Sequence, residues 1–255
     1  HPDRNKITRA LGTEEDVKID FIKETLDDCI YLMCTDGLSN LISDEEIFQK
    51  LKIDADDEYV SDILELAEKS KAIAKPKAIY GIAYIDDRDE NHVIIEGIRF
   101  NSKLLSYNLK GVHKVFPYVA TCGEEIYRWA KSILDPIERY WTEAICEIYL
   151  NKVYVALKND LEHRIKPGKT AVMNPGSLES WPISEQKQLF ALLGEENIRK
   201  TGVKLTENFL MLPIKSVSGI IFPTEVNYEN CMLCPRERCP GRRAQFNPDD
   251  VKLSW

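Results

Sequence analysis

The chain has 255 residues, of which 44% are hydrophobic, and its formal net charge is −8. This composition fits a globular protein with a real core. The acidic balance argues against a nucleic-acid partner, because modules that bind the phosphate backbone usually carry a basic face. No run reaches the roughly 18 apolar residues of a membrane span, and the N-terminus lacks a signal-peptide pattern. Seven cysteines, an odd number, fit a reducing compartment, so we expect a cytoplasmic protein with no membrane partner.

The first 45 residues resemble a different family from the rest of the chain. They contain the stretch HPDRNKITRALGT, an apolar run over 29–33, and the stretch CTDGLSNLISDEEI. These stretches resemble part of the PPM-class metal-dependent serine/threonine phosphatases, and the resemblance implies that Asp36 helps to hold a divalent metal. One carboxylate cannot make a two-metal site, and the other metal-binding motifs of that family are missing. We therefore interpret residues 1–45 as a phosphatase-like segment without phosphatase activity; a phosphatase-derived regulatory protein is the weakest alternative.

The residues from 56 to 121 alternate between helical and extended patterns. Apolar residues at helical spacing from Val60 predict a helix that starts near Asp56 and closes before Pro76. The expected strands are 77–86 and 92–100, which form a hairpin around the charged turn 86–91, and 114–121, with a short helix over 101–110.

The longest predicted helix begins at Asp135, an N-cap residue, with Pro136 at the first helical position. An apolar stripe predicts that this helix crosses one face of the sheet, and it consists of Ile137, Tyr140, Trp141, Ala144, Ile145, Ile148 and Val155. Ser184 is expected to cap a shorter helix that runs to Leu193. Strands and helices mix without a regular βαβ repeat. The prediction is therefore an α+β fold, a mainly antiparallel twisted sheet flanked by helices.

Two short apolar runs, 208–212 and 216–222, are separated by Pro213 and predict two strands joined by a turn. In the second run we expect Ser216, Ser218 and Gly219 on one face, with Val217 and Ile220 on the other. Such a face either hydrogen-bonds a polar ligand or simply meets solvent.

These runs lie within the stretch LTENFLMLPIKSVSG, which follows Asn174-Pro175-Gly176, Trp181-Pro182 and Gln186. In order and spacing the two segments resemble the activation domain of cobalamin-dependent methionine synthase and its stand-alone anaerobic relatives. The resemblance covers residues 46–228, which we take as one domain. It implies that this domain binds S-adenosylmethionine and presents the methyl group to an oxidised cobalamin on a partner for reductive remethylation.

The resemblance also implies the residues that bind the ligand. The expected site consists of the loop Asn174, Pro175, Gly176 and Ser177, the strand residues Ser216 and Ser218, and Glu207. A glycine lets a ligand approach the main chain. The family has Arg where this chain has Val172, and Tyr where it has Ser177, so the arginine that would pair with the ligand carboxylate is absent from its usual position. Lys169, Lys215 and Arg199 are candidates to replace it.

The segment 229–255 is rich in cysteine. Cys231, Cys234 and Cys239 place three soft ligands within nine residues, a spacing that predicts a zinc site or an iron-sulfur cluster, with free thiols as the alternative. Cys122 is a candidate fourth ligand, although a buried core thiol is the more ordinary role for it. The arginines of this segment are expected to be a solvated surface, and they are Arg236, Arg238, Arg242 and Arg243.

No residue is a convincing general base or nucleophile, so the sequence leaves open whether the chain is an enzyme and favours positioning over acid-base catalysis. The favoured hypothesis is an accessory protein for reductive reactivation of a cobalamin-dependent methyltransferase, which docks on a corrinoid protein. The alternative is a metal or iron-sulfur module that has lost binding of S-adenosylmethionine. His92 and His113 are expected to be ordinary surface or hydrogen-bonded residues.

Overall fold

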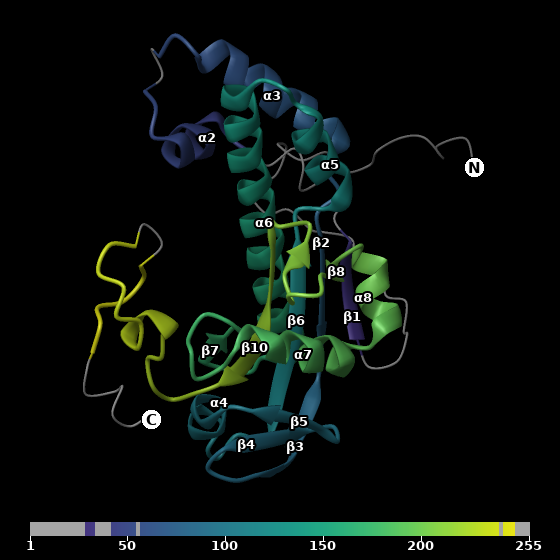
Figure 1. Cartoon of the computed structure of the whole chain (residues 1–255), viewed down its shortest axis with the longest axis vertical. Helices are drawn as coiled ribbons and strands as arrows, with labels where there is room; N and C mark the ends of the chain where they lie inside the picture. Colours follow the sequence, from purple (N-terminus) through teal and green to yellow (C-terminus); the bar gives the residue numbers. More distant parts are fainter. Residues whose placement is uncertain (1–28, 34–41, 55–56, 240–241, 248–255) are drawn as a thin grey trace.

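The computed structural model describes residues 29–33, 42–54, 57–239 and 242–247 (Figure 1). Its helices are α2 (Asp44–Leu51), α3 (Val60–Ile73), α4 (Lys103–Asn108), α5 (Glu124–Ser132), α6 (Pro136–Ile165), α7 (Gln186–Leu193) and α8 (Glu195–Thr201), with the 3-10 turns η1 (Ile183–Glu185) and η2 (Asn230–Met232). Its strands are β1 (Cys29–Met33), β2 (Lys77–Gly81), β3 (Ala83–Arg88), β4 (His92–Ile95), β5 (Ile98–Asn101), β6 (Lys114–Thr121), β7 (Thr170–Met173), β8 (Lys204–Leu205), β9 (Met211–Leu212) and β10 (Ser216–Pro223).

The main sheet is built around β6. On one side β6 pairs with β2, which pairs with β1, and at its other end β6 pairs with β3, which continues into β4 and β5. On its opposite side β6 pairs with β10, which in turn pairs with β7. Every pairing between described strands is antiparallel. The α+β fold with a mainly antiparallel sheet is therefore confirmed.

Helices cover both faces of this sheet. Helix α6 packs on one face, where Val153, Leu157 and Leu161 meet buried side chains of β2, β6 and β10. Helices α7 and α8 pack on the other face through Phe190, Leu193 and Ile198, against Ile79 of β2 and Val119 of β6.

A buried polar network fastens α6 to the sheet. The Asp160 carboxylate is 5% exposed and accepts hydrogen bonds from the Tyr80 hydroxyl (2.8 Å) and from Nε of Arg164 (2.6 Å). Burial, together with the neighbouring carboxylate, raises the pKa of Tyr80, so this phenol stays protonated and donates. The buried charge is thus fully partnered, as a buried carboxylate requires.

The N-terminal half of α6 extends beyond the sheet and carries a helical lobe made of α2, α3 and α5 (Figure 1). Ile47, Ile63 and Tyr149 are among the buried side chains that join these helices. Glu147 of α6 forms ion pairs with Lys50 of α2 and with Lys215 (3.3 Å), so it links the lobe to the start of β10. Burial raises the pKa of the Glu147 carboxyl, but the two lysines outweigh this effect and hold the pKa below its ordinary value.

Local signals explain the start of α6. The Asp135 carboxylate accepts hydrogen bonds from the backbone N–H groups of Ile137 (2.8 Å) and Glu138 (2.9 Å), and Pro136 occupies the first turn. The predicted start and the predicted packing on the sheet are confirmed. Part of the predicted stripe is wrong, because the exposed residues include Ile137, Tyr140 and Val155. Near its start the helix projects past the sheet, so too few neighbouring side chains are present there to bury the whole apolar stripe.

Several predicted boundaries need correction. The predicted strand 77–86 breaks at Ile82 into β2 and β3, and the predicted strand 92–100 folds back on itself at Gly97 (φ 73°) to give β4 and β5. The expected hairpin is nonetheless present as β3 and β4. Ser184 does not cap α7; it lies within η1, and α7 starts at Gln186 without a side-chain cap. The predicted strand 208–212 shrinks to β9, which pairs with β8.

The N-terminal segment contributes a strand to the same sheet. Strand β1 pairs with β2 from Cys29 opposite Gly81 to Met33 opposite Lys77. Asp36, the proposed metal ligand of the phosphatase-like segment, lies outside the described residues, and the division at residue 45 stays a prediction. None of the helices that the structure describes has an apolar stretch of the length that a bilayer crossing needs.

Candidate functional site

The loop that follows β7 lies directly over β10. Nδ2 of Asn174 donates hydrogen bonds to the Tyr118 hydroxyl and to the carbonyl oxygen of Ser218, both at 2.8 Å. Gly219 makes this contact possible, because a Cβ at that position would lie 2.6 Å from Nδ2 of Asn174. The structure thus brings Asn174 and Ser218 together, which sequence order alone does not require.

The next residues form a tight turn with an exposed outer surface. Gly176 adopts φ 80° and its N–H donates to the carbonyl oxygen of Trp181 at 2.8 Å, while a Cβ on Gly176 would lie 3.0 Å from Cβ of Ile183. The turn itself therefore requires glycine, apart from any ligand. Pro175 is buried, whereas Gly176 and Ser177 face solvent. The loop presents main chain and one small hydroxyl outward.

The two predicted strand serines are turned inward. The Ser218 hydroxyl is buried and donates to Oε1 of Gln186 in α7 at 3.2 Å. The Ser216 hydroxyl lies 2.8 Å from Oγ1 of Thr121 and 2.7 Å from the carbonyl oxygen of Pro213. Both hydroxyls are on one face, as expected, but the predicted faces of Gly219 and Ile220 are both wrong, since Gly219 shares the face of Val217. Side chains repeat every second residue, so Ile220 shares the face of Ser216 and Ser218 and packs in a core cluster with Leu189 of α7.

Glu207 lies apart from this loop. It is exposed in the turn between β8 and β9, and no hydrogen bond or ion pair joins it to the loop residues 174–177 among the described contacts. The small hairpin instead packs through Leu205 and Met211 on the core under α7 and α8. Nearby, a pocket of about 420 Å³ is lined by Phe190, Ile198 and Val203, with Arg199 at its side.

The described part of the C-terminal tail, 229–239 and 242–247, docks beside the loop after β7 together with Tyr228, which precedes it. Nδ2 of Asn230 donates to Oδ1 of Asn174 at 3.4 Å, and the Tyr228 hydroxyl donates to Oδ1 of Asn230 at 2.9 Å. The Tyr228 ring packs on Phe222 of β10, with 6.2 Å between ring centroids. The two regions that the sequence singled out separately, the loop and the Cys-rich tail, are therefore neighbours.

Inside the tail, an arginine occupies the centre of the cysteine turn. The Arg242 guanidinium donates to the carbonyl oxygens of Cys231 (3.0 Å), Cys234 (3.0 Å) and Ala244 (3.1 Å). Arg242 thus holds the turns of the tail together, and the prediction that it belongs to a solvated surface is wrong. Cys239 is partly buried in the same turn. Within the described part of the chain, no group of three or more His, Cys, Asp or Glu side chains is arranged to hold a metal ion. The zinc site or iron-sulfur cluster at Cys231, Cys234 and Cys239 stays a prediction.

Cys122, the candidate fourth ligand, is placed elsewhere. It is fully buried in the core of the helical lobe beside Cys146 of α6. Its hydrogen bond with Cys146 and its burial raise the pKa of the Cys122 thiol, which therefore stays protonated. This environment matches the ordinary core role of a buried cysteine.

Two tyrosines and an arginine that sequence reasoning did not select complete the surroundings of the loop. The rings of Tyr118 and Tyr154 are 5.4 Å apart, and their hydroxyls are hydrogen-bonded to each other. Burial raises the pKa of both phenols, and the positive charge of Arg243 in the tail opposes that rise. The backbone N–H of Arg243 donates to Sγ of Cys231 at 3.4 Å.

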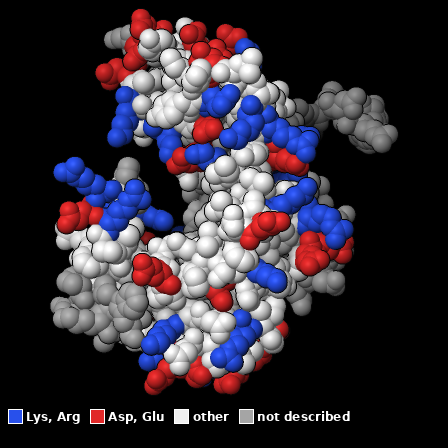
Figure 2. Space-filling model, in the orientation of Figure 1, with Lys and Arg blue, Asp and Glu red and all other residues white. Residues whose placement is uncertain are grey.

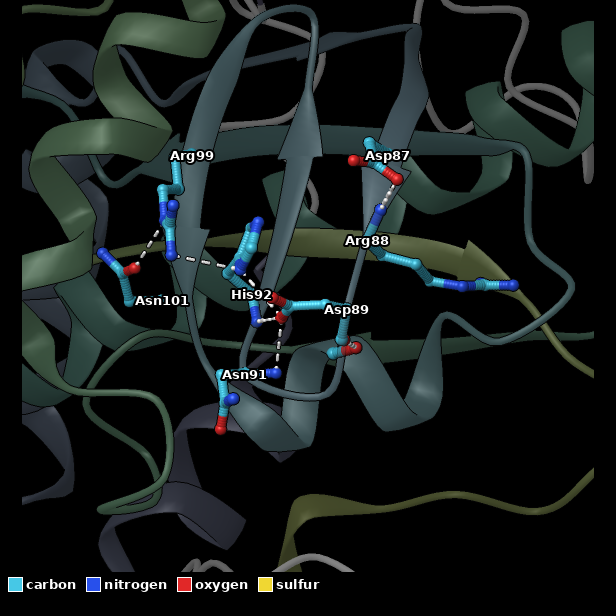
Figure 3. A network of polar contacts seen from close by, with 8 residues as sticks. Asp87, Arg88, Asp89, Asn91, His92, Arg99 and Asn101 are labelled. Carbon is cyan, nitrogen blue, oxygen red and sulfur yellow. Dashed lines mark hydrogen bonds and ion pairs between the residues drawn. The ribbon is translucent and has the colours of Figure 1, made fainter.

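His92 lies outside this region. His92 lies at the tip of the β3–β4 hairpin, where its Nδ1 is 2.7 Å from Oδ1 of Asp89 and 3.1 Å from the Arg99 guanidinium (Figure 3). The backbone N–H groups of Asn91 and His92 also donate to Asp89. His92 is thus a hydrogen-bonded hairpin residue, as predicted.

Comparison with known proteins agrees with the arrangement of loop, strand and tail. Residues 175–239 match the sequence model of a family described as vitamin B12 dependent methionine synthase, activation domain. A crystal structure of the MetH reactivation domain bound to AdoHcy matches with a TM-score of 0.59 and 17% identity, over 79% of this chain and 81% of that chain. No curated protein matches the chain at a significant level. The resemblance to the activation-domain family is therefore confirmed, by sequence over residues 175–239 and by fold over most of the chain.

Proposed function

We propose that this chain binds S-adenosylmethionine and acts as an accessory in the reductive remethylation of a cobalamin-dependent methyltransferase such as methionine synthase. One observation carries the proposal. The family match over residues 175–239 contains the turn at Gly176, strand β10 and the start of the tail, and these segments meet along β7. The similar crystal structure holds AdoHcy, which is S-adenosylmethionine without the transferred methyl group.

The edge of the sheet at β7 suits such a ligand. Strand β7 pairs with β10 on one side, and among the described residues no strand pairs with its other side. Free main-chain N–H and C=O groups of an edge strand are available to hydrogen-bond a partner. The exposed turn at Gly176 and Ser177 continues this edge, so a nucleoside has main-chain donors and acceptors on a rigid support.

In this proposal the chain positions the ligand and contributes no general base. S-adenosylmethionine supplies the methyl group from its sulfonium centre, and an external reductant supplies the electron. The residues of this chain hold the nucleoside at the edge of β7 and so fix the orientation of the ligand relative to the corrinoid partner. The activation-like domain 46–228 and the tail 229–255 would act together, because Asn230 of the tail contacts Asn174 of the domain.

Calorimetric titration with S-adenosylmethionine and with AdoHcy tests the proposal. A variant at Gly176 is a poor choice, because any side chain there meets Ile183. Ser177→Trp places bulk on the exposed turn and is expected to weaken both ligands at least about 10-fold, which is about 1.4 kcal/mol. Asn91→Trp, at the exposed tip of the β3–β4 hairpin, is the matched control and should leave both affinities unchanged.

Two results would contradict the proposal. The first is folded wild-type protein that gives no saturable heat with either ligand. The second is equal weakening by Ser177→Trp and Asn91→Trp, which would place binding elsewhere. A cobalamin-containing methyltransferase in its oxidised form then tests the accessory role, since its absorption spectrum reports methylation of the cobalamin in the presence of reductant, S-adenosylmethionine and this chain.

A further inference from the structure

The pocket between α7, α8 and β8 lies apart from the edge of β7. Its volume is about 420 Å³, and it shares no lining residue with the loop at Gly176. Figure 1 shows α7 and α8 in front of the sheet, whereas α6 runs behind it. Small-molecule sites commonly have volumes of about 300 to 1,000 Å³, so this pocket has the size that suits a compact ligand.

The floor of this pocket is apolar. Phe190, Ile198 and Val203 line it and also belong to the core cluster under α7 and α8, where each is at most 9% exposed. Ala191 and Leu205 complete the apolar lining. Because packing in the core fixes the buried side chains, the floor keeps its shape without a ligand. An apolar group that lies on this floor is removed from water, which favours its binding.

Three cations from three different elements surround this floor. Lys187 of α7, Arg199 of α8 and Lys204 of β8 line the pocket, and all three residues are exposed. We call them the cationic rim. Among the contacts between described residues, none of the three side chains forms an ion pair or a hydrogen bond. Glu195 is the only carboxylate among the described lining residues, so the lining carries a net positive charge in a chain whose net charge is −8. Figure 2 shows Lys and Arg atoms at the place of α8, with acidic atoms beside them.

The floor and the rim together select the chemical class of the ligand. Cations that converge around an apolar cleft create a positive potential, which attracts an anion. The guanidinium of Arg199 offers parallel N–H donors to a carboxylate, phosphate or sulfonate group. S-adenosylmethionine suits this rim poorly, because its sulfonium and ammonium groups give it a net positive charge. Helix α8 packs on β2 and β6, so Arg199 belongs to this pocket and is not placed to replace the arginine missing at Val172 on β7.

We propose that the pocket between α7, α8 and β8 binds a small organic anion with an apolar body and a carboxylate, phosphate or sulfonate group. The apolar body lies on Phe190, Ile198 and Val203, and the anionic group pairs with Arg199 and the lysines of the cationic rim. This site is separate from the edge of β7 and does not depend on the proposed function.

Fluorescence titration with two dyes tests the proposal: 1-anilinonaphthalene-8-sulfonate, and N-phenyl-1-naphthylamine, which has the same rings without the sulfonate. Wild-type protein should bind the sulfonate dye saturably. Arg199→Glu is expected to weaken the sulfonate dye at least about 10-fold and to leave the neutral dye within about 2-fold, because it replaces an attraction by a repulsion. Lys158→Glu makes the same reversal of charge at an exposed position of α6, on the other face of the sheet, and should change neither affinity.

A second variant fills the pocket without disturbing the core. Ala191 lines the pocket and is exposed, so Ala191→Trp should keep the fold and weaken both dyes at least about 10-fold. Near-ultraviolet circular dichroism checks that each variant keeps its tertiary packing, since such dyes also bind partly unfolded protein. Octanoate and 3-phenylpropionate should displace the sulfonate dye while their uncharged amides do not, and the stronger of the two acids indicates an aliphatic or an aromatic body.

Several results would overturn the assignment of this pocket. They are the absence of a saturable signal from folded wild-type protein, sulfonate-dye binding within about 2-fold of wild type in Arg199→Glu or in Ala191→Trp, equal weakening of both dyes by Arg199→Glu, and displacement by the amides as strong as by the acids. AdoHcy should not displace the dye, because its expected site is the edge of β7. If AdoHcy does compete, the nucleoside binds in this pocket, and both placements are wrong. Dye binding without any binding of AdoHcy would contradict the proposed function alone.

Discussion

Replacement of Gly219 by alanine tests how closely β7 and its loop lie against β10. Gly219 is opposite Tyr118 in the register of β10 and β6. An added Cβ would lie 2.3 Å from the carbonyl oxygen of Met173 and 2.6 Å from Nδ2 of Asn174, so β7 must move away. Overpacking of this kind typically costs about 1 to 3 kcal/mol, and each of the two hydrogen bonds of Asn174 contributes about 1 kcal/mol. We expect Gly219→Ala to lower the free energy of unfolding by about 3 to 5 kcal/mol.

Urea denaturation followed by circular dichroism measures this loss. Gly111→Ala is the matched control: Gly111 has φ 76° with no atom within 4 Å of an added Cβ, so its cost of about 1 kcal/mol is conformational. Gly219 lacks such a positive φ, and its cost is therefore steric. If Gly219→Ala proves as stable as Gly111→Ala, the close seating of Asn174 over β10 is wrong. The same variant should also weaken binding of AdoHcy, because the loop at Gly176 follows Asn174.

Two further predictions concern the links that hold the lobe and the tail. Lys50 and Lys215 hold the pKa of Glu147 below 4.5, so the stability that this carboxylate contributes is present above about pH 4.5 and is lost as the pH falls through the lower folded pKa. Glu147→Gln should therefore flatten the fall of Tm between about pH 5 and about pH 3, and parallel curves for variant and wild type would refute this. Arg242→Ala should speed amide hydrogen exchange in the tail, because the Arg242 guanidinium donates hydrogen bonds to backbone carbonyl oxygens of the tail. Arg238→Ala is the control and should leave the exchange rates unchanged. Unchanged exchange in Arg242→Ala would contradict the structural role of Arg242.

Elements defined by local signals were predictable from the sequence. The start of α6 follows from Asp135 and Pro136, whose capping contacts involve only the next few residues. Strand β6 has the predicted bounds 114–121. The wrong predictions concern positions where contacts with residues distant in the sequence determine the local structure. Ser184 is a good cap residue by type, yet η1 replaces the expected first turn of α7, and Glu185 instead accepts a hydrogen bond from the backbone of Asn101 (2.9 Å).

The candidate site shows the same division. By itself the sequence determined the fold class, the turn at Gly176 and the resemblance to the activation-domain family. These depend on the hydrophobic pattern, on residue types that favour turns and on the order of motifs, all of which are properties of the chain itself. Only the tertiary structure decided that the Ser218 hydroxyl is used inside the core, that Cys122 is buried in the core of the helical lobe while the tail cysteines are partly exposed, and that the tail docks on the loop. Those outcomes depend on antiparallel register and on packing between segments that lie 32 to 56 residues apart in the sequence. The hydrophobic periodicity of one segment carries no information about which side chain of another segment it will contact.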